Sequence, residues 1–250
     1  MKIVRAQKDG EAFYAARDGD VLKRLAEAPY ERFTFTGETL AANDVVLLVP
    51  CEPTKIIAVG LNYAKHALEL HGQLADSPVL FLKPLTALIA HRDAIEYPAI
   101  SQRVDYEAEL AVVIGKRCKN VTPLEAQSCI FGYTALNDVT ARDLQKIDGQ
   151  WTRAKSFDTF CPVGPSIDTE FTPAGQRIQS VLNGVTQQES TLDSMINDVP
   201  ALISFISACM TLLPGDIIAT GTPEGIGPMQ RGDTIEVRIE GLETLINLVK

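Results

Sequence analysis

The chain has 250 residues, of which 46% are hydrophobic and 22% are charged, a composition typical of a globular protein with one large domain. Its formal net charge of −9 argues against nucleic acid or an anionic membrane as the main partner. Its five cysteines lack C-x-x-C spacing, the N-terminus has no signal-peptide core and no apolar run reaches membrane-spanning length, so we expect a cytoplasmic protein with unpaired thiols.

Residues 1–50 are expected to form a small β-rich domain that ends in an apolar, strand-like run at residues 45–49. Three pairs that end in glycine separate short segments of this domain: Asp9-Gly10, Asp18-Gly19 and Thr36-Gly37. Such pairs are typical of tight turns between strands. After a short linker at residues 51–54, the apolar segments become longer. We therefore predict a second, larger domain over residues 51–250.

A strand over residues 56–59 opens the larger domain and leads, after a turn at Gly60, into a segment that carries His66 and Glu69. Residues three apart share one face of a helix, and a histidine oriented by a carboxylate is the usual arrangement of a general base. The spacing alone favours a simpler interpretation, in which the two side chains form an incidental ion pair on a solvated helix face.

The apolar run at residues 106–115 predicts a buried strand that carries two carboxylates, Glu107 and Glu109. Side chains alternate along a strand, so these two point the same way, about 7 Å apart. Asp138 follows the next apolar run and could supply a third oxygen ligand. Buried carboxylates need a cation, a shared proton or an arginine, and an all-oxygen set suits Mg²⁺ or Mn²⁺. The alternative is the exposed edge of an ordinary strand.

Two basic residues follow these candidate ligands. Arg142 lies four residues after Asp138, where it either pairs with the acidic cluster or binds a substrate carboxylate through two parallel hydrogen bonds. Lys155 is flanked by aromatic residues. A buried lysine beside a metal stabilises a developing enolate, whereas most lysines are surface charges.

Helix signals are fewer than strand signals. Thr122-Pro123 and Glu125 form a capping pattern with proline at the first helical position, which predicts a short helix. A second helix is predicted to begin at Asp198 and to stop at Pro214-Gly215.

Two further strands are predicted at residues 216–221 and 234–239, separated by a loop rich in glycine and proline. Thr222 and the N–H groups of this loop either face an anionic group or belong to a plain hairpin turn. Strands and helices alternate too irregularly for a doubly wound sheet or a (β/α)₈ barrel. We therefore predict a strand-dominated α+β fold.

Several segments resemble the fumarylacetoacetate hydrolase superfamily, in its short bacterial branch. They occur in one order across residues 55–240 and cover the whole large domain: GLNYAKHALE, FLKP, VDYEAELAVVIGK, GYTALNDVTARDLQ, QWTRAKSFDTFCPVGP and LLPGDIIATGTPEGIGP. The resemblance implies a mixed β-sandwich roll, preceded here by the small β-rich domain and assembled as a homodimer.

The resemblance also implies a role for each candidate site residue. The three carboxylates would hold Mg²⁺ or Mn²⁺. His66 and Glu69 would activate a water molecule, which reverses the interpretation that their spacing favours. Lys155 would stabilise an enolate. The implied metal ligands are Glu107, Glu109 and Asp138, and the implied substrate contacts are Tyr63, Arg142, Gln145 and Thr222.

The leading hypothesis is metal-dependent hydrolysis of a C–C bond in an acylpyruvate-type 1,3-dioxo acid, such as fumarylpyruvate or acetylpyruvate, which leaves a pyruvate enolate held by the ion and Lys155. Two alternatives use the same site. One is decarboxylation of a β-oxo acid such as oxaloacetate. The other is isomerisation of a 2-hydroxymuconate or 2-hydroxyhepta-2,4-diene-1,7-dioate type of substrate in aromatic catabolism. A non-catalytic protein that binds metal or organic acids has no use for His66 and Glu69, so we expect an enzyme.

Overall fold

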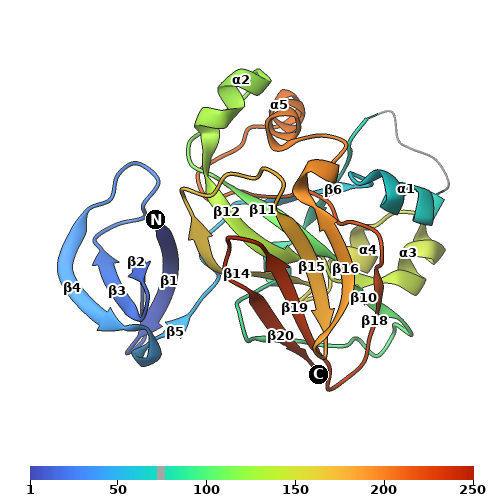
Figure 1. Cartoon of the computed structure of the whole chain (residues 1–250), viewed down its shortest axis with the longest axis horizontal. Coiled ribbons are helices and arrows are strands. Elements are labelled where there is room, and N and C mark those ends of the chain that lie inside the picture. Colours follow the sequence, from blue (N-terminus) through green and yellow to red (C-terminus); the bar gives the residue numbers. More distant parts are fainter. Residues whose placement is uncertain (72–76) are drawn as a thin grey trace.

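The computed structural model describes residues 1–71 and 77–250. Strands outnumber helices in these ranges, which confirms the strand-dominated α+β prediction. In Figure 1 the N-terminal strands form a small unit beside a larger body that contains the remaining strands and the helices. No helix within the described ranges is long and apolar enough to cross a membrane.

The described residues form three sheets. The largest has 12 strands and contains, from one edge to the other, β4 (Phe35–Ala41), β3 (Val21–Leu25), β2 (Glu11–Asp18), β1 (Lys2–Lys8), β14 (Cys161–Asp168), β12 (Ile130–Asn137), β11 (Ala108–Ile114), β17 (Ile217–Ala219), β6 (Ile56–Gly60) and β7 (Val79–Lys83), with β5 (Val46–Leu47) paired to β1 and β8 (Leu88–Ile89) paired to β14. The second contains β16 (Val185–Thr191), β15 (Arg177–Leu182), β19 (Thr234–Ile239), β20 (Leu245–Val249) and β9 (Ala94–Ile95). The third contains β13 (Thr140–Ala141), β10 (Val104–Tyr106) and β18 (Gly227–Met229).

Strand β11 is buried along its whole length and separates two parts of the core. Leu110 and Val112 pack on the face covered by the second sheet and by helix α5 (Val199–Cys209). Ala111 and Val113 point the other way, into a cluster with residues of β6 and β14 such as Val163. A strand covered on both faces is apolar throughout apart from functional positions, so Glu109, on the face of Ala111, stands out as a buried charge.

Short helices join the strands in the described ranges: α1 (Ala64–His71), α2 (Pro123–Ala126), α3 (Arg142–Asp148), α4 (Thr152–Lys155) and α5 (Val199–Cys209). Helix α2 has the predicted capping box. The Thr122 side chain accepts from the backbone N–H of Glu125, and the Glu125 side chain accepts from the backbone N–H of Thr122. This reciprocal pair satisfies two N–H groups that the helix leaves free.

Helix α5 begins where the sequence predicts but ends early. The Asp198 side chain accepts a hydrogen bond from the backbone N–H of Ala201 at 2.9 Å, as expected of a helix N-cap. The helix ends at Cys209, before the predicted stop at Pro214. The backbone of Leu212 instead pairs with Cys118 as a β-bridge, and this extended pairing takes the chain out of the helix.

The N-terminal unit is β-rich, as predicted, and its first turn shows why. Asp9 and Gly10 both have positive φ, 50° and 86°, which is the geometry of a two-residue hairpin between β1 and β2. The predicted strand at residues 45–49 is shorter, because only Val46–Leu47 pairs with β1. β1 also pairs with β14 through Lys2 and Ile3, so the largest sheet continues across the proposed boundary at residue 50.

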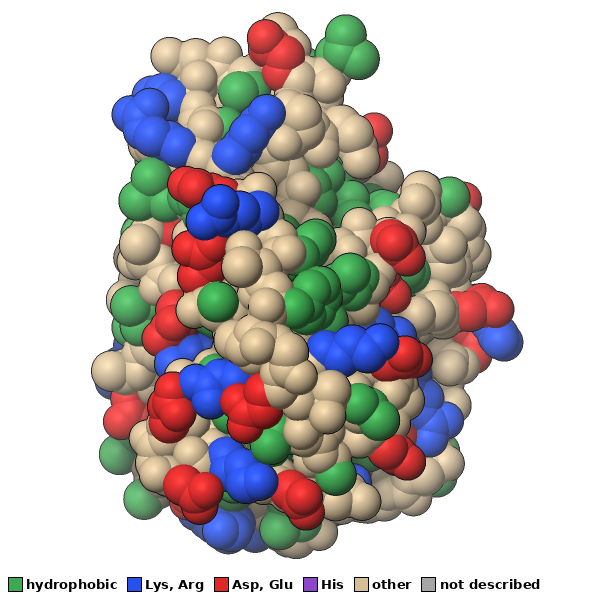
Figure 2. Space-filling model, turned by 90° about the vertical axis from the view of Figure 1, so that its left-hand side faces the viewer, with side chains coloured by type: hydrophobic (Ala, Val, Ile, Leu, Met, Phe, Trp, Pro, Cys, Tyr) green, Lys and Arg blue, Asp and Glu red, His purple; other side chains and the backbone are tan. Residues whose placement is uncertain are grey.

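On the side of the N-terminal strands, acidic and basic side chains are interspersed over much of the surface (Figure 2). Arg24 on β3 illustrates the pattern, because it forms ion pairs with Glu11 on β2 and with Glu38 on β4. Exposed pairs of this kind contribute little to stability. Their mixture of signs on this face offers no concentrated positive field for an anionic polymer.

Hydrogen bonds to Asp216, whose side chain is fully buried, anchor the linker to the core. Its Oδ1 accepts hydrogen bonds from Thr54 N at 3.0 Å and Thr54 Oγ1 at 2.7 Å. Its Oδ2 accepts from Leu213 N at 2.8 Å and forms an ion pair with Lys55. Since removing one partner leaves buried donors unsatisfied, this carboxylate should contribute strongly to stability.

We expect Asp216→Ala to lower the free energy of unfolding by about 3 kcal/mol, the scale for breaking a buried charged pair with its hydrogen bonds. Chemical denaturation measures this difference. Asp158→Ala removes an exposed aspartate and serves as the control, with an expected change within about 0.5 kcal/mol. Equal effects of the two substitutions would contradict the anchoring role.

Candidate active site

Three carboxylates meet in the interior where strands of the largest and the third sheet begin or end. Glu107 occupies the break between β10 and β11, Glu109 lies in β11, and Asp138 directly follows β12. β11 and β12 are antiparallel, with Ala108 opposite Asn137, so the strand register brings the three acids together. One oxygen of each lies within 4.8 Å of the others, and all three residues are buried.

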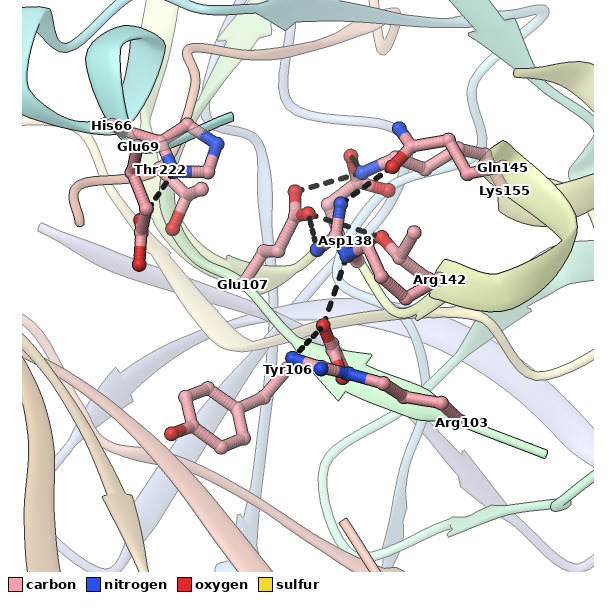
Figure 3. Close-up of polar contacts among 12 residues, drawn as sticks. His66, Glu69, Arg103, Tyr106, Glu107, Asp138, Arg142, Gln145, Lys155 and Thr222 are labelled. Carbon is pink, nitrogen blue, oxygen red and sulfur yellow. Dashed lines mark hydrogen bonds and ion pairs between the residues drawn. The ribbon is translucent and has the colours of Figure 1, made fainter. Parts of the chain in front are cut away.

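Two buried lysines face these carboxylates. Lys155 Nζ lies 2.7 Å from Glu107 Oε2 and 2.7 Å from Asp138 Oδ2 (Figure 3). Lys83 Nζ lies 2.6 Å from Asp138 Oδ1 and also donates to the backbone oxygen of Lys155. Lys83 lies in the FLKP segment, and no role was predicted for it from the sequence. Its partner is 55 residues away in the chain, so no local pattern could reveal the pair.

Arg142 pairs with the acidic cluster, which was one of the two alternatives that the sequence left open. Its Nε donates to Asp105 Oδ2 at 2.9 Å, and its Nη2 donates to Glu107 Oε1. Its Nη1 donates to Gln145 Oε1 at 2.7 Å. Asp105 is fully buried and was missed by the sequence analysis. Because the guanidinium is held by two carboxylates, it fixes the amide of Gln145 at the edge of the cluster.

Burial and neighbouring charges act differently on Glu107 and Glu109. Burial raises the pKa of Glu107, but the positive charges of Lys155 and Arg142 outweigh it and hold that pKa well below its ordinary value. Burial and the negative charges of Asp138 and Glu107 raise the pKa of Glu109 well above its ordinary value. A further cation near Glu109 would therefore stabilise the cluster most.

Helix α1 brings His66 and Glu69 together on one face. His66 Nδ1 lies 3.3 Å from Glu69 Oε2, with the imidazole buried and the carboxylate half-exposed (Figure 3). Burial lowers the pKa of His66 despite the nearby carboxylates, which favours a neutral imidazole at pH 7. The imidazole of this pair is therefore buried, whereas the spacing alone favours an ion pair on a solvated helix face.

The start of α1 is held by the preceding turn. Leu61 has a φ of 60°, a backbone conformation that is uncommon for a bulky residue. The side chain of Asn62 donates to Thr220 O at 2.8 Å and to Asn197 O at 3.0 Å. These contacts tie the turn to two other segments, so the position of His66 is fixed by the surrounding fold.

Thr222 and Tyr63 are placed differently from the other predicted contacts. Thr222 Oγ1 donates to Ala108 O at 2.9 Å and accepts from Gln188 Nε2 at 2.8 Å, so its hydrogen is already engaged. Gly221 N donates to Glu109 Oε2 at 2.8 Å. The glycine-rich loop therefore binds a carboxylate of the protein itself. Tyr63 is buried but does not line the pocket formed by the described residues.

The predicted site residues other than Tyr63 and Glu69 line one narrow pocket with a free volume of about 10 Å³, which is roughly the space of one water molecule. Its lining combines ionisable and polar groups with apolar side chains and a glycine. The lining residues are Val59, Gly60, Leu61, His66, Phe81, Glu107, Glu109, Asp138, Arg142, Gln145, Trp151, Lys155 and Thr222.

Comparison with known proteins identifies the fold that carries this site. Residues 55–250 match the fumarylacetoacetate (FAA) hydrolase C-terminal family, and residues 1–50 match the Rv2993c-like N-terminal family. The chain belongs to the fumarylacetoacetate hydrolase family. The sequence-based resemblance is thereby confirmed. The homodimer that the resemblance implies stays a prediction.

Three relatives of this family member have names that state an activity. The structure of 5-carboxymethyl-2-hydroxymuconate delta-isomerase from Mycobacterium smegmatis is 43% identical with a TM-score of 0.94, over 100% of this chain and 99% of that one. The mitochondrial oxaloacetate tautomerase of Rattus norvegicus is 38% identical over 83% of this chain and 70% of its own length. Fumarylpyruvate hydrolase from Pseudomonas aeruginosa, in complex with Mn²⁺ and pyruvate, is 31% identical with a TM-score of 0.74, over 80% of this chain and 90% of that one.

The carboxylate cluster fits the divalent ion expected in this family. Three buried carboxylate oxygens close to one another form a hard donor set, which suits Mg²⁺ or Mn²⁺. The repulsion that raises the pKa of Glu109 is the electrostatic signature of a site that a cation would complete. The buried acidic triad therefore supports a divalent metal, and a related structure contains Mn²⁺.

We expect Mn²⁺ to raise the melting temperature of the wild-type chain relative to EDTA, because a ligand at about 100 times its Kd stabilises the folded state by about 2.7 kcal/mol. Glu109→Gln removes one ligand and should abolish most of this rise. Glu31→Gln, at an exposed position, is the matched control and should keep it. Thermal melts that show no response of the wild type to either Mg²⁺ or Mn²⁺ would contradict the metal site.

A pH series in EDTA tests the electrostatics of Glu109. A pKa raised in the folded state means stability that is present below the unfolded value and lost as the pH rises through the folded one. The amide of Glu109→Gln resembles the protonated carboxyl at every pH. The variant and the wild type should melt alike near the ordinary value of 4.5, and the variant should become the more stable as the pH rises. A difference independent of pH would count against this account.

Proposed function

We propose that this chain is a divalent-metal-dependent isomerase or tautomerase that moves a proton on the enol form of a small 2-oxo acid, with oxaloacetate as the first substrate to test. The sequence-based hypothesis placed C–C bond hydrolysis first. The isomerase and the tautomerase are 43% and 38% identical to this chain, whereas the hydrolase is 31% identical. The relatives thus favour the alternative over the leading hypothesis.

The observation that carries the proposal is that the His66 imidazole and the Lys155 ammonium line one narrow pocket. Proton transfer needs a group that changes charge near neutral pH, and a developing enolate needs a positive charge beside it. Burial lowers the pKa of His66. Burial also lowers the pKa of Lys155, but the charges of Asp138 and Glu107 outweigh it and raise that pKa. His66 can therefore accept a proton while Lys155 stays charged.

In this proposal Glu107, Glu109 and Asp138 would hold the metal ion, which would supply Lewis-acid chemistry at the 2-oxo group. Lys155 Nζ, which is 2.7 Å from two oxygens of the cluster, stabilises the enolate oxygen. His66 takes the proton from the carbon next to the carbonyl and delivers it to the enolate oxygen, which gives the enol, and the reverse transfer gives back the keto form.

Two polar side chains complete the arrangement in this proposal. Glu69 orients the imidazole of His66 through the 3.3 Å contact with its Nδ1. Gln145, whose Oε1 accepts from Arg142, directs its amide donor toward a substrate oxygen. Both act by fixing orientation, so substitutions that keep hydrogen-bonding ability should cost less than truncation to alanine.

Hydrolytic cleavage of an acylpyruvate is the second candidate, and the His66–Glu69 pair favours it. A carboxylate-oriented imidazole is also the arrangement that activates water. The difference lies in the reactants: hydrolysis requires a water molecule beside the substrate, whereas tautomerisation requires none. Decarboxylation of oxaloacetate is a third outcome, because it yields the same kind of enolate without a base.

The test follows three reactions in parallel on the Mn²⁺-loaded protein. Enol–keto interconversion of oxaloacetate is followed by the absorbance of the enol, and pyruvate release is measured from oxaloacetate and from acetylpyruvate. We expect tautomerisation to be the fastest. Faster pyruvate release from acetylpyruvate would establish a hydrolase, and faster release from oxaloacetate a decarboxylase.

We expect His66→Ala to slow tautomerisation by about 10²–10⁴-fold, the usual contribution of a general base, while the Mn²⁺-induced rise in melting temperature persists. His91→Ala is the matched control, because His91 accepts a hydrogen bond from Ile246 N at 3.1 Å outside the pocket. Its rate should equal that of the wild type. An unchanged rate in His66→Ala would sink the assignment of the base.

A further inference from the structure

Trp151 lines the pocket and lies directly on Gly60. A Cβ atom at Gly60 would lie 2.3 Å from Cζ3 and 2.6 Å from Cη2 of the indole, closer than any real contact. The φ of Gly60 is not in the left-handed region, so the backbone itself would accept alanine. The absence of a side chain at this position is therefore what gives the indole its place.

The indole is also held from its other side. Its ring packs edge-to-face against Phe81, with centroids 5.3 Å apart, and Lys155 Nζ lies 5.3 Å from the centroid of Phe81. Lys155 N donates to Trp151 O at 3.0 Å, one helical turn away. Phe81 thus connects the aromatic wall to the ammonium that faces the carboxylates, and the wall has little freedom to move independently.

Charge is distributed unevenly along the pocket. Arg142 and Lys155, the cations that line it among the described residues, are both paired with acids of the cluster. Phe81 and Trp151 supply the aromatic part of the same lining, and the Phe81 ring centroid lies 5.3 Å from Lys155 Nζ. A substrate carboxylate would be attracted to the cluster once a divalent ion adds positive charge there, and the rest of the acid would then meet the aromatic side chains in a pocket with a free volume of only about 10 Å³.

We propose that Trp151 is a specificity-determining residue, which limits the length of the 2-oxo acid that the pocket accepts. The inference rests on the proposed function only in assuming a 2-oxo acid bound at the carboxylate cluster. It assigns the size limit to one contact, the indole on Gly60. It predicts that compact acids such as pyruvate and oxaloacetate bind well and that each added methylene beyond this size is penalised.

The test is the binding of a homologous series to the Mn²⁺-loaded protein by calorimetry: pyruvate, 2-oxobutanoate, 2-oxopentanoate and 2-oxohexanoate. In the wild type we expect the affinity to fall at least tenfold from pyruvate to 2-oxohexanoate, since one methylene in a tight pocket changes selectivity by about 10-fold or more. Trp151→Ala should reverse or flatten this order. Trp151→Phe keeps a ring in place and should lie close to the wild type.

Two controls separate a local effect from a loss of folding. Phe33→Ala removes a ring that is 40% exposed and does not line the pocket, and it should leave the series unchanged. The Mn²⁺-induced rise in melting temperature should persist in Trp151→Ala. Because Trp151 is the one tryptophan in the chain, wild-type fluorescence reports the pocket directly, and Gly60→Ala should shift its emission to longer wavelength as the ring is displaced toward solvent.

Each outcome decides between the two proposals. Binding of all four acids with equal affinity in the wild type, or a series in Trp151→Ala that keeps the wild-type order, overturns the role of Trp151 and leaves the proposed function intact. Failure of the Mn²⁺-loaded wild type to bind any of them, pyruvate included, overturns the assumption of a 2-oxo acid and this inference with it. A length preference that disappears with the indole supports both.

Discussion

Charge balance among buried side chains is the constraint on which the rest of the structure depends. Four buried carboxylates face three buried cations at the site, with the half-exposed Arg103 as an additional partner of one acid. Removing a partner from such a network is costly, because it leaves a charge buried and unpaired. The groups are Asp105, Glu107, Glu109 and Asp138 on the acidic side and Lys83, Arg142 and Lys155 on the basic side. Among the buried groups alone one carboxylate is in excess, and this favours a divalent cation there.

The fold satisfies this constraint with segments that are distant in sequence. Lys83 ends β7 and reaches Asp138 across 55 residues, and Lys155 on α4 reaches Glu107 across 48. Helices α3 and α4 have 7 and 4 residues, which is too short for a helix to be stable in water by itself. They are therefore positioned by their side-chain contacts. The ion pairs and the two short helices therefore stabilise each other at the sheet edge.

Local patterns predicted those parts of the site that follow from a single strand or helix. Glu107 and Glu109 could be placed on one side because strand side chains alternate, and the apolar residues after them indicated burial. The same reasoning could not find Lys83 or the contact between Trp151 and Gly60, because those partners meet only when separate segments pack. A glycine at the end of a strand predicts a turn, and nothing in the local sequence says that an indole fills the space above it.

Room for water distinguishes the reactions that this family scaffold supports. Proton transfer within a bound 2-oxo acid uses groups already in the pocket, whereas hydrolysis adds a third reactant between His66 and the substrate. The free volume of about 10 Å³ corresponds to roughly one water molecule, so a bound 2-oxo acid already requires lining groups to move, and a water molecule beside it requires a further displacement. The aromatic wall is held by the packing of Trp151 on Gly60 and Phe81. Under the proposed function, the extent to which this aromatic packing yields would decide whether water joins the substrate, while the carboxylates and Lys155 supply the chemistry that both reactions share.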